Sequence, residues 1–291
     1  HRIIVTTLEG QVLAVIGSGE RGLADGPFAQ ARFAKPQGLA LREEQLYIAD
    51  TENHALRLAD LRSGSVRTLA GDGNYGYWGA QDARGRPRLN SPWDLVIVGE
   101  KLYIAMAGLH QLWVYDLAQG TMAAYAGSGR EGLLDGPLAR AALAQPSGIT
   151  SDGHQLYFAD SEASAIRTAD LGAPGMVRTL VGQGLFDFGD VDGPWPTARL
   201  QHPLGVAWYQ GALYVADTYN HKIKSLNLTQ ATTQTLTGTG QPGRRDGPEA
   251  QFYEPGGLAA AGGRLYIADT NNHAIRVADL RSRQVKTLEL H

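Results

Sequence analysis

A block of sequence recurs along this chain of 291 residues at steps of 52 to 57 residues, and it constrains the fold more than any other feature. Its clearest copy, from Pro36 to Gly71, contains PQGLAL, QLYIAD, TENH, ALRLADL and SVRTLAG in that order. Each copy holds four short segments rich in branched and aromatic residues and bounded by Gly, Asn, Asp or Pro. Such segments are typical of β-strands.

Repeated four-stranded units of this length are typical of propeller blades, each of which buries its faces against its neighbours. Residues 1–17 align with residues 54–71, so they correspond to the third and fourth strands of a further blade. We therefore predict an all-β, six-bladed β-propeller over residues 1–291. Its predicted parts are a partial blade at 1–17 and complete blades at 36–71, 92–127, 146–182, 203–238 and 255–291. The two missing strands are expected before His1 or after His291, which would make the chain a fragment.

Composition narrows the chemistry that this chain can perform. It contains no cysteine, which excludes disulfides, thiol chemistry and a cysteine zinc site. A net charge of −3 gives no reason to expect a polyanionic partner, and no apolar run approaches the ~20 residues of a membrane helix. We expect no nucleic-acid or membrane partner. The sequence does not identify the compartment. We expect a soluble chain and favour the cytoplasm over the periplasm.

Long connections between the predicted blades carry the tripeptide Asp-Gly-Pro, which begins at Asp25, Asp135, Asp192 and Asp246. We expect these connections to be folded caps, with one helical turn after the proline, rather than free linkers.

The recurring Asp-x-x-Asn-His motif invites interpretation as a set of metal ligands. Its copies are Asp50, Asn53 and His54; Asp217, Asn220 and His221; and Asp269, Asn272 and His273. Third-strand residues of neighbouring blades lie too far from the axis to share an ion, because metal ligands must lie within ~2.0–2.6 Å of it. We therefore predict no metal site, and expect Asp and Asn to bond the turn between the second and third strands.

The second complete blade departs from the repeat. It has Met106 in place of Asp and Leu109 in place of Asn, and it gains Gln111 and Trp113. It also opens with Pro92-Trp93-Asp94, so that Asp94 stands where the other copies have glycine. Either the repeat has drifted, which the residues alone favour, or a pocket is present. The pocket would be formed by Trp93, Asp94, Met106, His110 and Gln111.

Two loops on the predicted connection-bearing face are rich in aromatic residues. They contain Tyr75, Tyr77 and Trp78 before the second blade, and Phe186, Phe188 and Trp195 before the fourth. Exposed, these aromatics would mark an interface; folded inward, they would fill gaps between blades.

The predicted channel mouth is acidic, which disfavours RNA binding because RNA requires a basic stripe. Its carboxylates are Asp50, Glu52, Asp94, Asp160, Glu162, Asp217 and Asp269. No P-loop, zincin helix or nucleophile elbow is present, and His110 has no evident Ser or Cys partner. We predict no catalytic residue and no cofactor.

The Asp-Thr-x-Asn-His tracts resemble NHL repeats. Together with SPWDL, IAMAGLHQLW, FGDVDG, LQHPLGVAW and YVADTYNHKIK, they resemble the propeller of the thioredoxin-like/NHL-repeat fusion family. The resemblance implies a six-bladed propeller preceded by a thioredoxin-like domain that supplies the missing strands at the junction. It also makes the set Trp93, Asp94, Met106, His110 and Gln111 the leading candidate site.

These observations give three functional hypotheses. The first is a non-catalytic binding or scaffold domain that recognises a protein or small ligand, on its loop-bearing face, for a tethered redox domain. The second is a metal-dependent propeller lyase or hydrolase, and the third, disfavoured by charge, is an RNA-binding module. The candidate binding residues are Trp93, Asp94, Met106, His110, Gln111, Tyr77, Trp78, Phe186 and Phe188.

Overall fold

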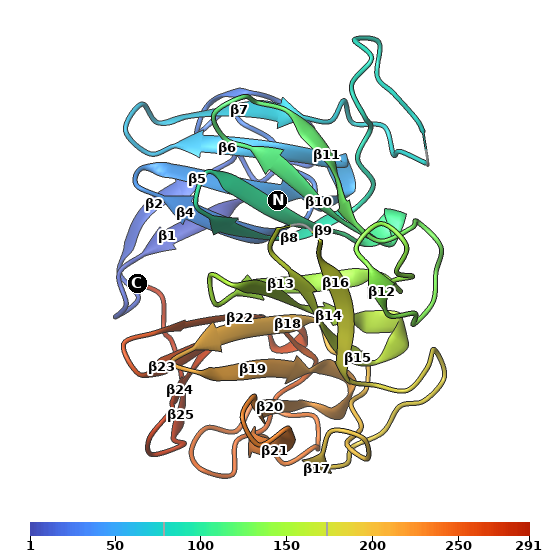
Figure 1. Cartoon of the computed structure of the whole chain (residues 1–291). Helices are drawn as coiled ribbons and strands as arrows, with labels where there is room; N and C mark the ends of the chain where they lie inside the picture. The colour runs from blue at the N-terminus through green and yellow to red at the C-terminus, as the bar shows by residue number, and fades with distance from the viewer. Residues whose placement is uncertain (78, 173) are drawn as a thin grey trace. The chain divides into compact units, whose positions relative to one another are not determined.

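The structure is a computed structural model that describes residues 1–77, 79–172 and 174–291 (Figure 1). In these ranges the chain is built of β-strands, and its helical segments are single turns of 3-10 helix. It divides into two compact units, His1–Arg130 with Leu290–His291 and Glu131–Glu289, and each is described by itself.

The first unit contains three antiparallel sheets. A two-stranded sheet pairs β1 (Ile3–Thr6) with β2 (Val12–Ile16). Blade 1 consists of β4 (Pro36–Arg42), β5 (Gln45–Asp50), β6 (Ala55–Asp60) and β7 (Ser65–Ala70), with β3 (Gly26–Pro27) on the outer edge of β7. Blade 2 consists of β8 (Pro92–Val98), β9 (Lys101–Met106), β10 (Gln111–Asp116) and β11 (Met122–Ala126).

The second unit contains three further blades. Blade 3 consists of β13 (Pro146–Ser151), β14 (Gln155–Asp160), β15 (Ala165–Asp170) and β16 (Met176–Val181), with β12 (Gly136–Pro137) outside β16. Blade 4 consists of β18 (Gly205–Tyr209), β19 (Ala212–Asp217), β20 (Lys222–Asn227) and β21 (Thr232–Thr237), with β17 (Gly193–Pro194) outside β21. Blade 5 consists of β22 (Pro255–Ala261), β23 (Arg264–Asp269), β24 (Ala274–Asp279) and β25 (Val285–Thr287).

The all-β propeller fold is confirmed, but the prediction of six blades is wrong. Five four-stranded blades are present, and the aligned segment at the start of the chain forms only the two-stranded sheet of β1 and β2. Within the described ranges no further strand pairs with β1. The alignment of residues 1–17 with half a repeat therefore predicted two strands correctly, but these strands are not part of a complete blade.

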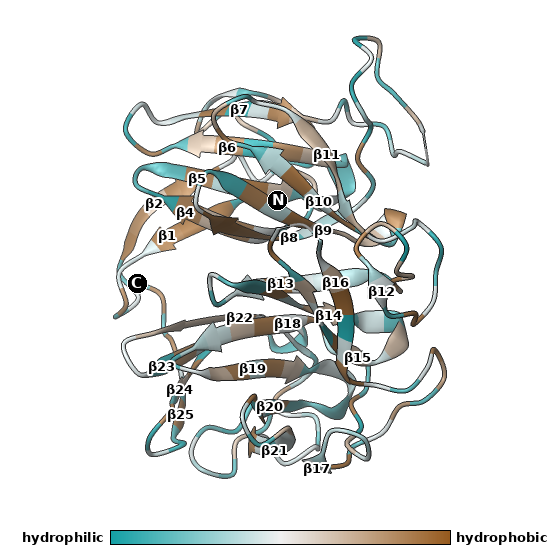
Figure 2. Ribbon diagram, in the orientation of Figure 1, coloured by the Kyte–Doolittle hydropathy of each residue, from teal (hydrophilic) through white to brown (hydrophobic). Residues whose placement is uncertain are grey.

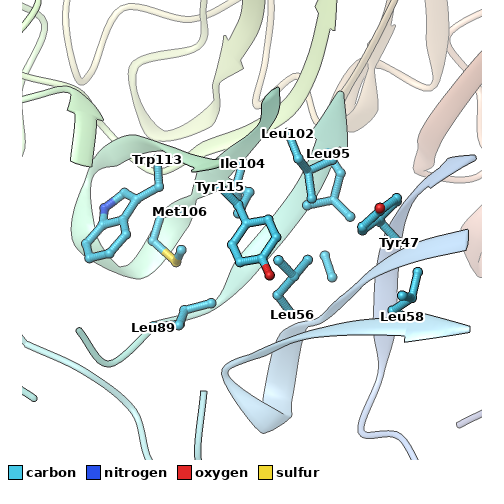
Figure 3. Packing of buried hydrophobic residues seen from close by; sticks show 11 residues of the cluster. Tyr47, Leu56, Leu58, Leu89, Leu95, Leu102, Ile104, Met106, Trp113 and Tyr115 are labelled. Carbon is cyan, nitrogen blue, oxygen red and sulfur yellow. The ribbon is translucent and has the colours of Figure 1, made fainter. Parts of the chain in front are cut away.

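One buried cluster of the first unit lies between blades 1 and 2, and a second joins the sheet of β1 and β2 to blade 1. Figure 2 shows apolar residues running along the strands and hydrophilic residues gathered in the connecting loops. Tyr47 and Leu56 of blade 1 pack with Leu95, Met106 and Trp113 of blade 2 in one buried cluster (Figure 3). A blade thus buries its faces against its neighbour, as an isolated sheet could not.

A buried ionic cluster joins each connection that carries Asp-Gly-Pro to the blade that follows it. In blade 1 the Arg57 guanidinium lies 2.7 Å from the carboxylate of Asp50 and 2.9 Å from that of Asp25, and the Arg57 and Asp50 side chains have no exposed surface. The other Asp50 oxygen accepts the amide of Ala34, and the Asn53 side chain donates both to Asp50 and to the Gly22 carbonyl. Asp and Asn of the motif are therefore structural, but they hold the preceding connection and not the turn that follows them.

The histidine of the motif joins one blade to the next. His54 lies in the left-handed region at the end of the 3-10 turn Thr51–Asn53, and its Nδ1 accepts the amide of Ser91, which precedes the first proline of blade 2, at 3.0 Å. His221 accepts the amide of Glu254 at 3.2 Å in the same way. Ring nitrogens engaged in this manner stabilise the packing of neighbouring blades.

The outer ends of these connections are also anchored. The Asp25 carboxylate accepts the amide and the hydroxyl of Thr68 on β7, at 3.0 and 2.9 Å. After the proline the Ala31 amide bonds the Pro27 carbonyl, which gives the expected single helical turn. The same pattern of Asp, buried Arg and strand Thr recurs in blades 3 and 5.

This burial corrects the prediction of an acidic channel mouth. Four of the carboxylates assigned to it have no exposed surface, and the first three of these are paired with buried arginines: Asp50, Asp160, Asp269 and Asp217.

Blade 4 has a variant of the cluster in which lysine replaces arginine. The Lys224 ammonium bonds the carboxylates of Asp190 and Asp192. Asp217, which is fully buried, accepts hydrogen bonds from the Gln201 amide and the Asn220 side chain. Burial raises the pKa of Asp217 to about 7, and it also raises the pKa of Asp160, to which Arg167 is bonded, to about 6.

The ion pair of blade 3 provides a test of the cluster. Arg167→Met is expected to lower the free energy of unfolding by about 3–5 kcal/mol, because it leaves the buried Asp160 carboxylate without its cation. The double variant Asp160→Met, Arg167→Trp, which copies blade 2, is expected to lose less than this single variant. Urea denaturation measures both, and a double variant no more stable than Arg167→Met would contradict the argument.

Blade 4 is expected to make stability depend on pH. Between pH ~4 and ~7 folded Asp217 holds a proton that the unfolded chain has released, so its contribution to the free energy of unfolding falls as pH rises through this window. Lys224→Arg should bond Asp217 directly, lower its pKa and flatten the fall. Urea denaturation from pH 4.5 to 8 tests this, with Lys222→Arg as the control. Equal slopes in the two variants would show that Asp217 is not responsible.

Candidate functional site

The connection before blade 2 is unlike the other connections between blades. It lacks Asp-Gly-Pro, and within the described residues it lays no strand along the outer edge of its blade. Like the other connections it folds back on itself, here with a bridge between Gln81 and Pro87. The Asp82 amide bonds the Arg86 carbonyl at 2.8 Å, and the Arg88 amide bonds the Ala80 carbonyl at 3.0 Å. In Figure 1 this loop is drawn in cyan and projects from its unit.

In the described part of the chain no connector strand covers the outer edge of β11. The outer strands of blades 1, 3 and 4 each pair with a Gly-Pro strand, that of blade 5 bridges to Gly247, and β2 is bonded by His291. Trp113 pairs with Ala124 as Arg57 pairs with Thr68, so Ala124 occupies the position of Thr68. The Thr68 amide is bonded by Asp25, whereas in the described part of the chain no carboxylate bonds the amide of Ala124.

Blade 2 has also lost its ionic cluster, and the loss is compensated. Met106 and Trp113, both buried, stand where blade 1 has Asp50 and Arg57, and Figure 3 shows their side chains in the core cluster. The Trp113 indole donates to the Gln111 side chain at 3.0 Å, and Gln111 donates to the Gly127 carbonyl at 2.9 Å. Blade 2 therefore has an apolar wall where blade 1 has buried charges, and the polar atoms of Trp113 and Gln111 in this wall are hydrogen-bonded.

A cavity of about 200 Å³ lies between this wall and the projecting loop. The residues that line it include Tyr77, Pro87, Arg88, Leu109, Gln111, Trp113 and Ala124. Most of its surface is apolar, and Tyr77 is 68% exposed at its edge. We call this cavity the blade 2 cleft. Its composition suits the binding of an apolar group, since it presents aromatic and aliphatic side chains with few polar atoms.

The loop that contributes to the lining of the blade 2 cleft carries one positive charge that is unpaired among the described residues. Arg88 pairs with Asp72 and Arg86 pairs with Asp82. Arg84 is exposed, and among the described residues it has no ion-pair partner. One uncompensated cation therefore lies on the same loop as the cleft lining.

The structure divides the nine candidate residues. Tyr77 and Gln111 line the cleft, and Met106 is buried in the adjoining core. Trp93 and Asp94 are half-buried at the start of the innermost strand β8, where Asp94 bonds the Leu95 amide. His110 is half-buried in the left-handed position that ends the 3-10 turn of its blade.

The remaining candidates lie elsewhere. Phe186 and Phe188 belong to the second unit, on the connection before blade 4, with 91% and 57% of their surface exposed. Trp78 lies outside the described residues. Sequence reasoning did not include Leu109, Trp113, Pro87, Arg88 or Ala124 in the site. Blade 2 is the one complete blade without Asp-Gly-Pro before it, and this signal would have located them.

The described residues contain neither a candidate metal-binding cluster nor a helix that could span a membrane. No group of three or more His, Asp or Glu side chains is placed there to hold a metal ion. No helix in these ranges combines the length and apolar character needed to cross a membrane.

Comparison with known proteins identifies relatives of this chain. An NHL repeat model matches residues 252–278. The chain is 47% identical over 301 residues to Protein SUPPRESSOR OF QUENCHING 1, chloroplastic, of Arabidopsis thaliana, an alignment that covers 96% of this chain and 28% of that protein. It is 41% identical over 327 residues to NHL repeat-containing protein 2 of Homo sapiens, which covers 100% of this chain and 45% of that protein. The chain thus spans less than half the length of these relatives.

Among solved structures, a chain in the crystal structure of a nidogen/laminin complex has a similar fold. The TM-score is 0.64 at 19% sequence identity, and the match covers 90% of this chain and 82% of that chain. At this identity the likeness concerns the fold alone.

The uncovered edge can be observed directly in the free protein. The amide of Ala124 is expected to exchange with deuterium at least tenfold faster than the amides of Thr68, Thr179 and Thr235, since each of these is held by a connector carboxylate. Residue-resolved hydrogen exchange by NMR measures all four. Equal protection at Ala124 and Thr68 would show that the edge of β11 is covered.

Proposed function

Because this chain belongs to the NHL-repeat β-propeller family, we propose that it is a non-catalytic binding domain whose recognition site is the blade 2 cleft. The observation that carries the proposal is the concerted loss, in one blade, of the ionic cluster and of the connector on its outer strand. Together these losses leave an apolar wall facing a cavity, beside a loop that carries Arg84, which is unpaired among the described residues.

Binding and not catalysis is favoured by the residues of the cleft. Trp113, Leu109 and Pro87 offer contact surface, and the polar atoms of Gln111 and Trp113 are already bonded to one another. Among the described residues that line the cleft, no nucleophile is paired with a general base. A protein side chain or a small apolar ligand fits such a site.

We further propose that in a full-length protein this domain serves a tethered thioredoxin-like redox domain. The chain covers only part of its relatives, and it contains no cysteine of its own. A binding module joined to a catalytic one raises the effective concentration of the captured partner to roughly millimolar for a short linker. This proposal supposes that the cleft captures the substrate of the redox domain.

Small apolar probes test the cleft. Indole and p-cresol are expected to bind the chain at millimolar concentrations, and Leu109→Asn, which restores the residue found at the equivalent position of blade 1, should weaken binding about tenfold or more by making the wall polar. Ligand-observed NMR with competition between the two probes measures this. Leu41→Asn, at an exposed leucine on β4, is the matched control. Binding that is absent, or that is equal in both variants, would reject the cleft as the recognition site.

A further inference from the structure

The blade 2 cleft and the uncovered edge of β11 meet at Ala124, which lines the one and belongs to the other. We propose that the ligand is an extended peptide that pairs with β11 as an added strand and places one apolar side chain in the cleft. This inference rests on the proposed function and specifies the chemistry of its partner. Strand addition to an open sheet edge combines backbone hydrogen bonds for affinity with a side-chain pocket for specificity.

The chain itself shows what the outer edge of a blade accepts. In blade 1 the connector pairs antiparallel to β7, with Gly26 opposite Val66 and Pro27 opposite Ser65. By register, Met122 of β11 stands where Val66 stands in blade 1. An extended segment laid along β11 would therefore meet the same backbone pattern that the connectors meet elsewhere.

The same template predicts the side chain that enters the cleft. In blade 1 the residue just before the paired Gly-Pro is Asp25, whose carboxylate reaches both Arg57 and Thr68. In blade 2 these two positions hold Trp113 and Ala124, both of which line the cleft. The chain's own Gln81, which follows Ala80 as Asp25 follows Ala24, also lines the cleft. A ligand side chain placed beside it would meet an indole and a methyl group, so it should be apolar.

The size of the cleft agrees with one such side chain. An apolar cavity of about 150 Å³ is enough to hold benzene, so a cavity of about 200 Å³ accommodates one aromatic ring or one branched aliphatic group. The exposed Arg84 has no ion-pair partner among the described residues, and it lies on the loop that contributes to the cleft lining, so it favours an acidic residue in the peptide.

The sequence of β11 also favours pairing of its outer edge with a strand of another chain. Exposed edge strands are usually protected by charged residues or proline, because an open edge invites pairing with other chains. β11 reads Met-Ala-Ala-Tyr-Ala and carries neither, and Ala123 and Ala124 are exposed. Small side chains at these positions leave room for a strand to approach.

The experiment selects peptides and then asks how they bind. A phage-displayed random dodecapeptide library is panned on the purified chain, and the selected peptides are synthesised and measured by fluorescence anisotropy. We expect a shared pattern of one large apolar residue beside an acidic one. Ala124→Pro removes the outward amide and should weaken binding at least tenfold, whereas the control Ala124→Ser keeps the amide and should stay within twofold.

Each outcome decides between the two proposals. Peptides that are sensitive to Leu109→Asn but insensitive to Ala124→Pro would overturn strand addition and leave the cleft as a binding site. The same holds if indole binds the cleft but no peptide is selected. If neither indole nor any peptide distinguishes Leu109→Asn from the parent chain, both proposals fail.

A second measurement guards against misfolding of the proline variant. N-methylation of alternate amides along a selected peptide should abolish binding in one register and spare it in the other, because only one edge of the peptide faces β11. Uniform tolerance of N-methylation would overturn strand addition whatever the stability of Ala124→Pro.

Discussion

The contact on which the rest of this structure depends is the buried pair of a second-strand aspartate and a third-strand arginine. Arg57 and Asp50 have no exposed surface, and among the described residues the Arg57 Nε has no hydrogen-bond partner. Such a pair stabilises a fold only when its other polar atoms find partners. Those partners lie in the preceding connection, where Arg57 also bonds Asp25 and the carbonyls of Ala24 and Arg32. Satisfying one buried charge pair thus fixes the course of the connector, and the connector in turn covers the outer strand of the blade.

Blade 2 shows what happens when this requirement is removed. With Met106 and Trp113 in place of the charged pair there is no buried cation for a connector aspartate to satisfy, and within the described residues the connection lays no strand along β11. Replacing only one partner would leave an uncompensated buried charge, at a cost of about 3–5 kcal/mol, so the members of the cluster change together or not at all. Blade 4 is the intermediate case, in which Lys224 keeps the cation and Asp190 adds a carboxylate.

The sequence predicted the strands well because their signal is local. Spacing, branched residues and turn residues repeat in every copy, and each copy became an antiparallel four-stranded sheet. Burial was harder to predict, since the acidic mouth was inferred from aspartates such as Asp160 without the arginine seven positions later that takes their charge inside. For the site, comparison of copies drew attention to blade 2, but it could not show that Gln111 faces the cleft while Trp93 and Asp94 belong to the innermost strand.

Random divergence of the repeat and a binding site in blade 2 are distinguished by the number of independent features that change in this one blade. Drift explains the loss of a side chain, but it does not explain why the loss coincides with an uncovered strand that carries no charge or proline, and with a cavity whose wall has its polar atoms satisfied. An open edge is a liability that the other blades avoid with their own connectors. Its retention beside an apolar cleft is what a surface built for an extended partner requires.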